Sequence, residues 1–340
     1  AGLWISGWQD NGSNISSPAW KEAIGGDGMT CFFDWSSDYN IYASTEFGNF
    51  YSSFDGGNTW YYASNGISEP GLWNTPWLQD PQVYGTLYAG FKNVWMSNDQ
   101  GSSWAPISSW GTYYVSAIAV APSNDQYIYA AQFGALYVTN NDGTSWTNIN
   151  GTLPLDSSTI TGIAIDPNNA MHVWVCCGDW NSLHKVYKST DGGGTWTNIS
   201  AGLPNLPVNC IVYQAGTPDG IYIGTDMGVY YMDNTTGGWI PFNVGLPNVE
   251  VFSLSIFAPG NLLFAGTFGR GSWQTPTYVN TGINEVSFAS TCKVYPNPAT
   301  SAVKIEASNT DGGSGILTIA DITGRLVMQK NIGDGTGTIK

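Results

Sequence analysis

The sequence predicts an all-β fold, a seven-bladed β-propeller followed by a small β-sandwich, and three observations carry this prediction. A four-residue apolar pattern recurs seven times, a turn rich in Asp, Asn and Gly that ends in Trp accompanies five of the copies, and no segment has helical periodicity. A period of about 40–45 residues that holds four short strands is typical of one propeller blade. Seven copies of the pattern therefore predict seven blades.

The composition limits the classes of ligand. The chain has 340 residues, 10% of them charged, with 25 acidic and 10 basic side chains. Its surface must therefore be built largely from Ser, Thr, Asn and Gly. A formal net charge of −15 leaves too few cations to bind phosphates, so nucleic acid is excluded as a partner. Membrane insertion is not expected, because no apolar run approaches the roughly 20 residues of a spanning helix.

The recurring pattern consists of an aliphatic, an aromatic, a second aliphatic and a small residue. We assign it to strand B of each blade, with strands lettered A to D from the central channel outward. A shorter apolar segment that closes on Pro precedes most copies, as in residues 115–122, and is assigned to strand A. The seven copies are LWIS at 3–6, IYAS at 41–44, LYAG at 87–90, IYAA at 128–131, VWVC at 173–176, IYIG at 221–224 and LFAG at 263–266.

The first and last blades are incomplete in this pattern. Residues 1–24 supply strands B, C and D without strand A, and residues 251–276 supply A, B and C without a clear D. We expect that the first blade continues N-terminally, or that a terminal segment completes the ring by an unusual pairing. Unpaired strand edges would otherwise remain.

The turn that ends in Trp follows the pattern S-x-D-x-G-x-[TS]-W. It resembles the Asp-box of BNR-repeat and sortilin-like propellers, a group that includes bacterial sialidases, sortilin-type receptors and endo-xyloglucanases. We expect a structural role, in which the carboxylate (or an Asn in the worn copies) accepts backbone N–H groups, the Gly adopts a positive φ and the Trp packs between sheets. The residues assigned to these turns are Asp55, Gly57, Trp60, Asp99, Gly101, Trp104, Asn141, Trp146, Asp191, Gly193, Trp196, Asn234 and Trp239.

The sequence predicts no metal centre and no cofactor, apart from a structural calcium ion at the Asp-boxes. Each such turn offers only one carboxylate, which is a weak basis for calcium binding. The five cysteines show no paired CxxC spacing. The two histidines, His172 and His184, are too few for a zinc site and are poorly placed for a nucleophilic triad.

The composition changes after Thr277, where alternating apolar and polar residues predict short antiparallel strands. The run YPNPATSAVKIE followed by DITGRLV resembles the type A C-terminal sorting domain of the type IX secretion system, which is an immunoglobulin-like β-sandwich. The matching residues are Tyr295, Pro296, Asn297, Pro298, Asp321, Gly324 and Arg325.

This resemblance implies a location and a partner. The tail would be recognised by the type IX secretion machinery of a Gram-negative bacterium, and the protein would be secreted or held at the cell surface. We place the propeller at 1–277, a linker at 278–291 and the sorting domain at 292–340. We expect the sorting domain to be incomplete, because the final hairpin of that family does not appear before Lys340.

One face of the propeller gathers the residues that could carry chemistry. The B–C and D–A loops emerge on this side, which we call the B–C/D–A face, whereas the Asp-boxes lie on the opposite side. Paired carboxylates can hydrolyse glycosidic bonds, and aromatic rings stack on sugars. The candidate catalytic residues are Asp10, Asp27, Glu46, Asp179 and Asp226. The candidate ligand-binding residues are Trp73, Trp110, Tyr113, Trp180 and Arg270.

Three functions stay open at this point. The first is binding of an extracellular glycan or protein by the B–C/D–A face, which the lack of a catalytic motif favours. The second is xyloglucanase-like hydrolysis of a neutral polysaccharide by two carboxylates. The third is a structural or assembly role at the cell surface, in which unpaired strands accept a strand from a neighbour. A sialidase is excluded, because such enzymes use three arginines and this chain has Arg270 and Arg325 only.

Overall fold

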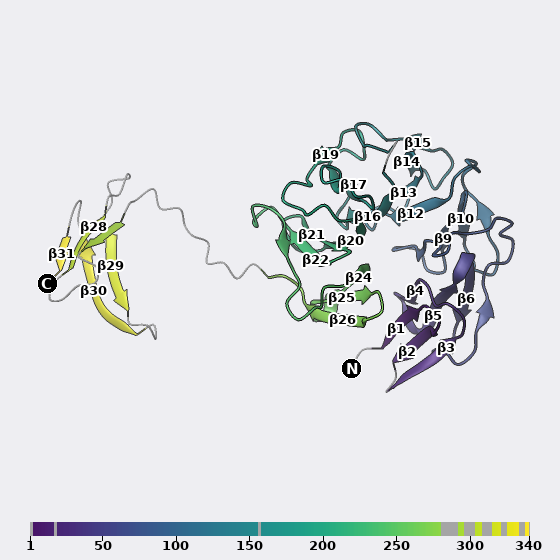
Figure 1. Cartoon of the computed structure of the whole chain (residues 1–340), viewed down its shortest axis with the longest axis horizontal. Coiled ribbons are helices and arrows are strands. Elements are labelled where there is room, and N and C mark those ends of the chain that lie inside the picture. The colour runs from purple at the N-terminus through teal and green to yellow at the C-terminus, as the bar shows by residue number, and fades with distance from the viewer. Residues whose placement is uncertain are drawn as a thin grey trace. The chain divides into compact units, whose positions relative to one another are not determined.

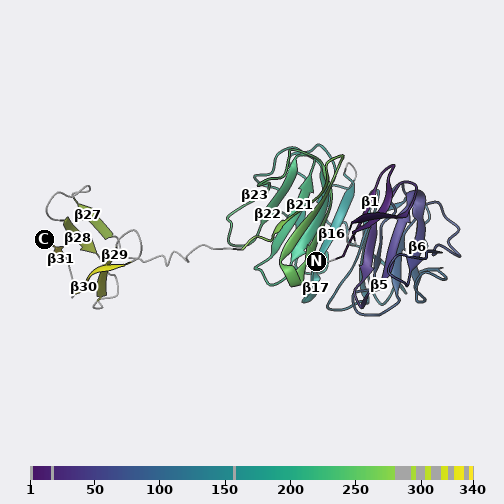
Figure 2. The same cartoon turned by 90° about the horizontal axis from the view of Figure 1, so that it is seen from below.

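A computed structural model describes residues 3–16, 19–155 and 158–279, together with residues 292–295, 303–307, 315–320, 325–332 and 337–339. The chain divides into two compact units, Ala1–Tyr278 and Val279–Lys340. The first unit is a ring of seven antiparallel sheets around a central channel (Figure 1). Seen from the side, the strands run roughly along the axis of the ring (Figure 2). The predicted seven-bladed all-β propeller is confirmed.

Blades II to VI each have four strands, and their chain order is also their order from the channel outward. Blade II contains β4 (Cys31–Asp34), β5 (Ser37–Thr45), β6 (Asn49–Ser53) and β7 (Tyr61–Tyr62); blade III contains β8 (Trp77–Gln79), β9 (Leu87–Gly90), β10 (Val94–Ser97) and β11 (Ala105–Pro106); blade IV contains β12 (Val115–Val120), β13 (Tyr127–Gln132), β14 (Ala135–Asn140) and β15 (Thr147–Asn148). Blade V contains β16 (Ile160–Asp166), β17 (Asn169–Cys177), β18 (Val186–Ser189) and β19 (Thr197–Asn198); blade VI contains β20 (Val208–Gln214), β21 (Gly220–Thr225), β22 (Gly228–Met232) and β23 (Ile240–Pro241).

The first and last blades have three strands each. Blade I contains β1 (Trp4–Trp8), β2 (Gly12–Ser16) and β3 (Trp20–Ile24), and blade VII contains β24 (Val251–Phe257), β25 (Leu262–Thr267) and β26 (Gly271–Pro276). Blade I thus lacks an inner strand and blade VII an outer one, within the residues that the structure describes. Two single-turn 3-10 helices, η1 (Glu46–Gly48) and η2 (Ala258–Gly260), follow β5 and β24.

The repeated apolar pattern reflects burial of strand B on both of its faces. In blade III, Leu87, Tyr88 and Ala89 of β9 are almost completely buried, and Ile128, Tyr129 and Ala130 of β13 are too. A strand packed between two neighbouring blades has no solvated face, so its sequence is continuously apolar rather than alternating.

The Asp-box turns cap their own chain, as the sequence predicted. The Asp99 carboxylate accepts the Ser97 hydroxyl at 2.7 Å and the Ser103 N–H at 2.9 Å, and Asp55 and Asp191 accept equivalent bonds. Asn141 does the same, because its Oδ1 accepts the Ser145 N–H at 2.9 Å. The carboxylate in blade VI comes one residue earlier than predicted.

Asp233, and not Asn234, caps the worn turn of blade VI. Asp233 Oδ1 accepts the backbone N–H groups of Thr235 at 2.7 Å and Thr236 at 2.9 Å. Met232 stands where the other turns have Ser or Thr, so no hydroxyl holds the usual acceptor position. Asn234 instead donates to Asp219 at 2.9 Å.

The Asp-box tryptophans join each blade to the one before it. The Trp104 indole Nε1 donates to the Ala63 carbonyl of the preceding blade connection at 2.7 Å. Three other Asp-box tryptophans repeat this bond across blades at 2.7–2.8 Å: Trp146 to Ile107, Trp196 to Ile149 and Trp239 to Ile199. Trp60 is the exception and donates to Gly57 within its own turn at 3.2 Å.

The Asp-box glycines are required by conformation and by space. Gly193 has a φ of 93°, and a Cβ there would lie 2.4 Å from Ile149 Cδ1 of the preceding blade. Gly101 has a φ of 88° and would meet Ala63 Cβ at 2.9 Å. Both positions therefore favour glycine, as expected for a left-handed backbone in close contact.

The Asp-box carboxylates should make the propeller sensitive to acid. Hydrogen bonds from Thr59 hold the pKa of Asp55 at about 2, and those from Thr195 also lower the pKa of Asp191. Because the folded-state pKa lies below the unfolded value of about 3.9, their contribution is complete above pH 4 and is lost as the pH falls toward 2. We expect Asp55→Asn to lower the melting temperature slightly at pH 6, with the difference from the wild type narrowing below pH 4 and closing only as the pH falls through about 2. A difference that is constant with pH would contradict this role.

The second unit contains two antiparallel sheets. In one, β28 (Val303–Ala307) lies between β27 (Cys292–Tyr295) and β31 (Gly337–Ile339), and in the other β29 (Gly315–Ala320) pairs with β30 (Leu326–Ile332). Residues 296–298, 321 and 324 of the sorting motif lie outside the described residues, and the immunoglobulin-like packing stays a prediction. No helix in the described part of the chain is long and apolar enough to cross a membrane.

Candidate functional site

The first carboxylates of the B–C/D–A face lie where blades I and II meet. Asp10 is in the β1–β2 turn with a φ of 62°, and its backbone N–H donates to Asp27 Oδ1 at 2.6 Å. Asp27 precedes β4 and is half-buried, whereas Asp10 is exposed. The structure therefore brings these two predicted residues together, and it occupies one Asp27 oxygen in holding the Asp10 turn.

Glu46 lies beside this pair and has an unused oxygen. It begins η1, and its Oε2 is buried without a hydrogen-bond partner among the described residues. A Cβ at Gly26, next to Asp27, would be 3.9 Å from Glu46 Oε2, so the carboxylate rests against the Asp27 loop. A buried carboxylate oxygen without a donor is costly unless a ligand or water supplies one.

Phe47 and Trp73 form an aromatic pair next to Glu46. Their ring centroids are 5.2 Å apart in an edge-to-face arrangement. Phe47 has φ 62° and ψ 23°, which is a left-handed conformation that aromatic residues rarely adopt. Two backbone bonds hold it there, from Phe47 N–H to the Trp73 carbonyl at 3.2 Å and from Gly71 N–H to the Phe47 carbonyl at 3.2 Å. Strain of this kind is found where a side chain must be presented in a fixed direction.

Further exposed apolar side chains continue around the same face. Tyr113 lies 5.4 Å from Phe133, centroid to centroid, and Phe268 lies 6.1 Å from Phe252. The exposed fraction is between 45% and 65% for the B–C/D–A loop residues Phe47, Trp73, Tyr113, Phe133, Trp180, Met227 and Phe268. Exposed apolar side chains thus recur in the loops of several blades, on the same side as the Phe47–Trp73 pair.

Sequence reasoning missed Phe47, Phe133, Met227 and Phe268. The signal was available, because each stands just after strand B in its own blade, at the start of a B–C turn. A large apolar residue that recurs one or two positions after strand B is not required by the turn, which points to a surface role.

Trp110 packs inside the propeller instead. Its ring stacks on Tyr137 at 4.3 Å and meets Trp146 edge-to-face at 4.9 Å. Its backbone N–H donates to Asn93 Oδ1 at 2.7 Å. Trp110 is half-buried and is therefore left out of the site that we describe. Arg270 is exposed in the last B–C turn, where its carbonyl accepts the Trp273 indole N–H at 3.0 Å.

The remaining two carboxylates lie between blades V and VI around a buried lysine. Asp179 Oδ2 accepts the Ser158 hydroxyl at 2.8 Å, and its Oδ1 is buried without a partner in the described residues. Lys185 is completely buried, and its Nζ donates to the Asp179 carbonyl at 2.5 Å. Burial lowers the pKa of Lys185, although the charges of Asp179 and Asp226 act in the opposite direction. Asp226 Oδ1 accepts the Asn209 amide at 3.0 Å.

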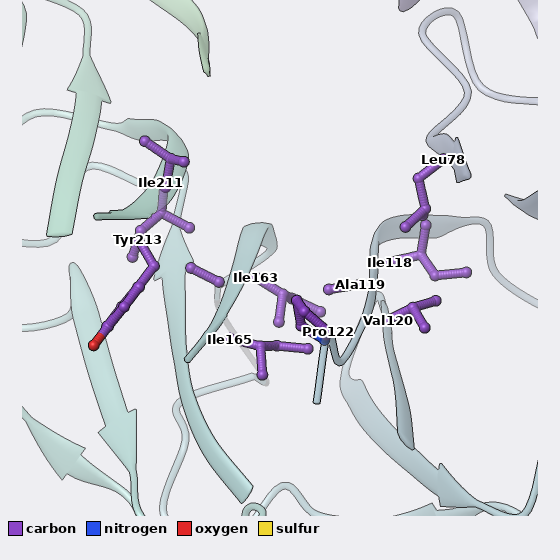
Figure 3. Close-up of a pocket in the computed structure, with 11 residues that line it drawn as sticks. Leu78, Ile118, Ala119, Val120, Pro122, Ile163, Ile165, Ile211 and Tyr213 are labelled. Atoms are coloured by element: carbon purple, nitrogen blue, oxygen red, sulfur yellow. The ribbon is translucent and has the colours of Figure 1, made fainter. Parts of the chain in front are cut away.

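A cavity of about 280 Å³ opens on the channel, between the inner strands of blades III to VI. Ile118, Ile163, Ile165 and Ile211 line it, and the Tyr213 hydroxyl is directed away from these aliphatic side chains (Figure 3). An apolar lining without convergent polar groups cannot orient a polar ligand. The cavity is therefore not included in the candidate site. In the described residues, no group of three or more His, Cys, Asp or Glu side chains is arranged to hold a metal ion.

Comparison with known proteins gives two family matches. Residues 92–226 match the family described as Sortilin, neurotensin receptor 3 (Sortilin-Vps10), and residues 293–340 match the secretion system C-terminal sorting domain. The chain is thus an Asp-box β-propeller protein that carries a type IX sorting domain. This tail identifies it as a secreted or cell-surface protein of a Gram-negative bacterium.

Among curated proteins, an oligoxyloglucan-reducing end-specific xyloglucanase of Emericella nidulans is 26% identical over 248 residues. The match covers 57% of this chain and 28% of that enzyme, so the chain spans just over a quarter of its length.

Two solved structures share the fold at low sequence identity. The GH74 xyloglucanase of Xanthomonas campestris has a TM-score of 0.67 and 15% identity, covering 90% of this chain and 56% of that one. PorZ, a surface component of the type-IX secretion system of Porphyromonas gingivalis, has a TM-score of 0.60 and 18% identity, covering 99% and 53%. The chain therefore spans about half of either structure.

Proposed function

We propose that this surface propeller binds a neutral extracellular glycan through the aromatic side chains of its B–C/D–A face. The observation that carries the proposal is the Phe47–Trp73 pair, in which a strained backbone presents an exposed ring beside a carboxylate with a free oxygen. The similarity to xyloglucanases supports a glycan over a protein ligand.

The chemistry of the face suits a neutral polysaccharide. Aromatic rings offer flat apolar surfaces with a polarisable face, which fits the C–H-rich faces of pyranose rings. The nearby acceptors Asp10, Asp27 and Glu46 can bind sugar hydroxyls. A net charge of −15 would repel a strongly anionic polymer.

The Phe47→Gly variant should lose ligand binding without losing stability. Glycine accepts the left-handed backbone at this position, so we expect the melting temperature to stay unchanged or rise. Loss of the ring should reduce retention on xyloglucan at least tenfold in affinity electrophoresis. Tyr39→Ala is the matched control, because Tyr39 is 70% exposed in the β4–β5 region, away from this face.

The panel should include xyloglucan, cellulose, mannan and an anionic pectin, with Trp180→Ala as a second variant. Equal retention of the wild type and Phe47→Gly would show that the aromatic pair does not take part in glycan binding. Retention on pectin alone would contradict the choice of a neutral ligand. The absence of retention on every glycan would favour a protein ligand instead.

Hydrolysis is the second candidate, because Glu46 Oε2 lies against the loop that carries Asp27 and has no donor among the described residues. Glycoside hydrolysis needs one carboxylic acid and one carboxylate flanking the bond. New reducing ends that disappear in Asp27→Asn and in Glu46→Gln, with retention preserved, would establish an enzyme. Retention on a glycan without new reducing ends would show that the protein binds the glycan and does not hydrolyse it. Asp38→Asn serves as the control, because Asp38 is an exposed carboxylate at the start of β5, on the opposite side from the B–C/D–A face.

A further inference from the structure

The connection between blades II and III, residues 63–76, holds Phe47 in its left-handed conformation. Its Gly71 N–H donates to the Phe47 carbonyl, and its Trp73 carbonyl accepts the Phe47 N–H, both at 3.2 Å. Both backbone groups of the strained residue are therefore bound by one segment. A left-handed backbone is unfavourable for a residue with a Cβ, so Phe47 keeps it only while this segment stays in place.

The segment also fits closely against the backbone of Phe47. A Cβ added at Gly71 would lie 2.8 Å from the Phe47 carbonyl oxygen. One added at Gly48, the residue after Phe47, would lie 2.6 Å from the Phe91 ring of blade III. Close contacts thus reinforce the two hydrogen bonds, and a shift of the segment would be transmitted to Phe47.

Glu69 fastens this segment to blade III. Its Oε2 accepts the backbone N–H groups of Lys92 at 2.9 Å and Asn93 at 3.0 Å, and its Oε1 accepts the Asn93 side-chain amide at 2.6 Å. Lys92 and Asn93 lie in the β9–β10 turn, so these bonds join a blade connection to the B–C turn of the next blade. Hydrogen bonds to an ionised carboxylate are stronger than those between neutral groups. Glu69 comes only two residues before Gly71, so the fastening point lies close to Phe47 along the chain.

The Asn93 side chain is held in one orientation by its neighbours. Its Oδ1 accepts the Trp110 backbone N–H at 2.7 Å and the Ser108 hydroxyl at 3.3 Å. The amide nitrogen is therefore directed to Glu69, and the carboxylate meets a donor whose direction is already set. Glu69 is thus bound to groups that the fold of blade III keeps in place.

The contacts of Glu69 indicate a role in placing the two rings. Both of its oxygens already accept hydrogen bonds from blade III, whereas Glu46 Oε2 has no partner among the described residues. The Glu69 side chain is half-buried, whereas Phe47 and Trp73 are 53% and 45% exposed. Its link to these rings runs along the backbone of residues 70–73.

We propose that Glu69 is a positioning residue for the Phe47–Trp73 pair. It fastens residues 69–73 to blade III, and it thereby sets the Phe47 backbone and the contact of the two rings before a ligand arrives. An aromatic pair that is already ordered binds more tightly, because less conformational freedom is lost on binding. The effect of Glu69 on glycan binding rests on the proposed function, whereas its effect on the two rings does not.

The arrangement of the rings can be measured without a ligand, by fluorine NMR of the full-length chain labelled with fluorotryptophan. The chain has 16 tryptophans, and the Trp73 resonance is the one that disappears in Trp73→Phe. Its frequency depends on the Phe47 ring, whose centroid is 5.2 Å from that of Trp73. We expect Glu69→Ala to move this resonance most of the way to its position in Phe47→Gly. Glu69→Gln keeps an acceptor for the two backbone N–H groups and should move it much less.

Glycan retention measures the consequence for binding. Glu69→Ala should reduce retention on xyloglucan by about tenfold in affinity electrophoresis. Glu69→Gln should stay within about threefold of the wild type. In the Phe47→Gly background, Glu69→Ala should change retention by less than about twofold, because the ring that it positions is already absent.

Glu250→Ala is the matched control and should change neither the resonance nor the retention. Glu250 lies in the β23–β24 connection of the same face, and no hydrogen bond joins its side chain to another described residue. Glu69→Asp takes the place of Glu69→Ala if the alanine variant does not fold. It keeps the charge but is one methylene shorter, and it should move the Trp73 resonance in the same direction.

An unmoved Trp73 resonance in the folded variant would overturn the proposal, whatever the glycan result. A loss of retention in Glu250→Ala equal to that in Glu69→Ala would also overturn it, as would a full further loss when Glu69→Ala is added to Phe47→Gly. A moved resonance, together with no retention of the wild type on any glycan, would support the positioning role and contradict the proposed function instead.

Discussion

Replacing Trp104 with alanine is expected to lower the free energy of unfolding of the propeller by about 3–5 kcal/mol. The indole is 7% exposed and packs with Phe50, Trp77 and Trp95 at the junction of blades II and III. Its Nε1 also donates to the Ala63 carbonyl, which would lose its partner. Truncation therefore leaves a cavity and an unpaired carbonyl at the same interface. Urea unfolding followed by circular dichroism measures the change.

Two variants resolve this effect into its parts. Trp104→Phe keeps an aromatic ring but removes the hydrogen bond, and should cost about 1 kcal/mol. Trp180→Ala removes an exposed tryptophan, 65% accessible on the B–C/D–A face, and should change stability by less than about 0.5 kcal/mol. Equal losses for Trp104→Ala and Trp180→Ala would show that the Asp-box tryptophan does not join the blades.

Replacing Lys185 with alanine is expected to cost about 2–4 kcal/mol, because its aliphatic stem is completely buried. Lys185→Met retains most of that volume and should change stability by less than about 1.5 kcal/mol near neutral pH. The two variants therefore tell the contribution of the stem from that of the ammonium group, which donates to the Asp179 carbonyl.

The stability difference between the wild type and Lys185→Met is also expected to depend on pH. Burial lowers the pKa of Lys185 in the folded state, so between that value and the unfolded value of about 10.4 the unfolded chain binds more protons. The contribution of this group to stability therefore rises with pH. Buried thiols such as Cys177, whose pKa is raised by burial, act in the opposite direction. The test is thus the difference in melting temperature between the wild type and Lys185→Met, which should shift in favour of the wild type from pH 7 to 9.5. A difference independent of pH would exclude a lowered pKa for Lys185 in the folded state.

The blades could be predicted from the sequence because the burial of each strand B produces a local apolar pattern. Strand B is covered on both faces, so its apolar run recurs without interruption, and the Asp-box adds a turn whose residues bond to one another. Both features are local, and the three-stranded first and last blades could be predicted from them. The exception, Asp233 in place of Asn234, arose where Met232 removed the usual hydroxyl from the turn.

The candidate site depended on contacts between loops, which the sequence does not encode locally. Asp27 could be placed on the correct face, but not its bond to the Asp10 backbone. Trp110 could be placed in a loop, but not its stacking on Tyr137. The burial of Lys185 could not be predicted, because nothing in the adjacent residues indicates that a lysine there is buried. The left-handed Phe47 was hidden for the same reason, since its conformation is imposed by the loop that carries Trp73.

The indole-to-carbonyl bonds of four Asp-box tryptophans, Trp104, Trp146, Trp196 and Trp239, all run in one direction along the chain, from a later blade to an earlier one. A blade emerging from a ribosome or an export channel therefore finds its acceptor already in place, and it leaves a new acceptor for the blade that follows. The blades should therefore pack one after another from the N-terminal side, and the contacts between blades I and VII should form last. Shortening the propeller from its C-terminal end would leave every earlier bond intact, whereas removing blades I and II from the other end would remove the Ala63 acceptor of Trp104. The two kinds of truncation should therefore differ in how much ordered structure survives.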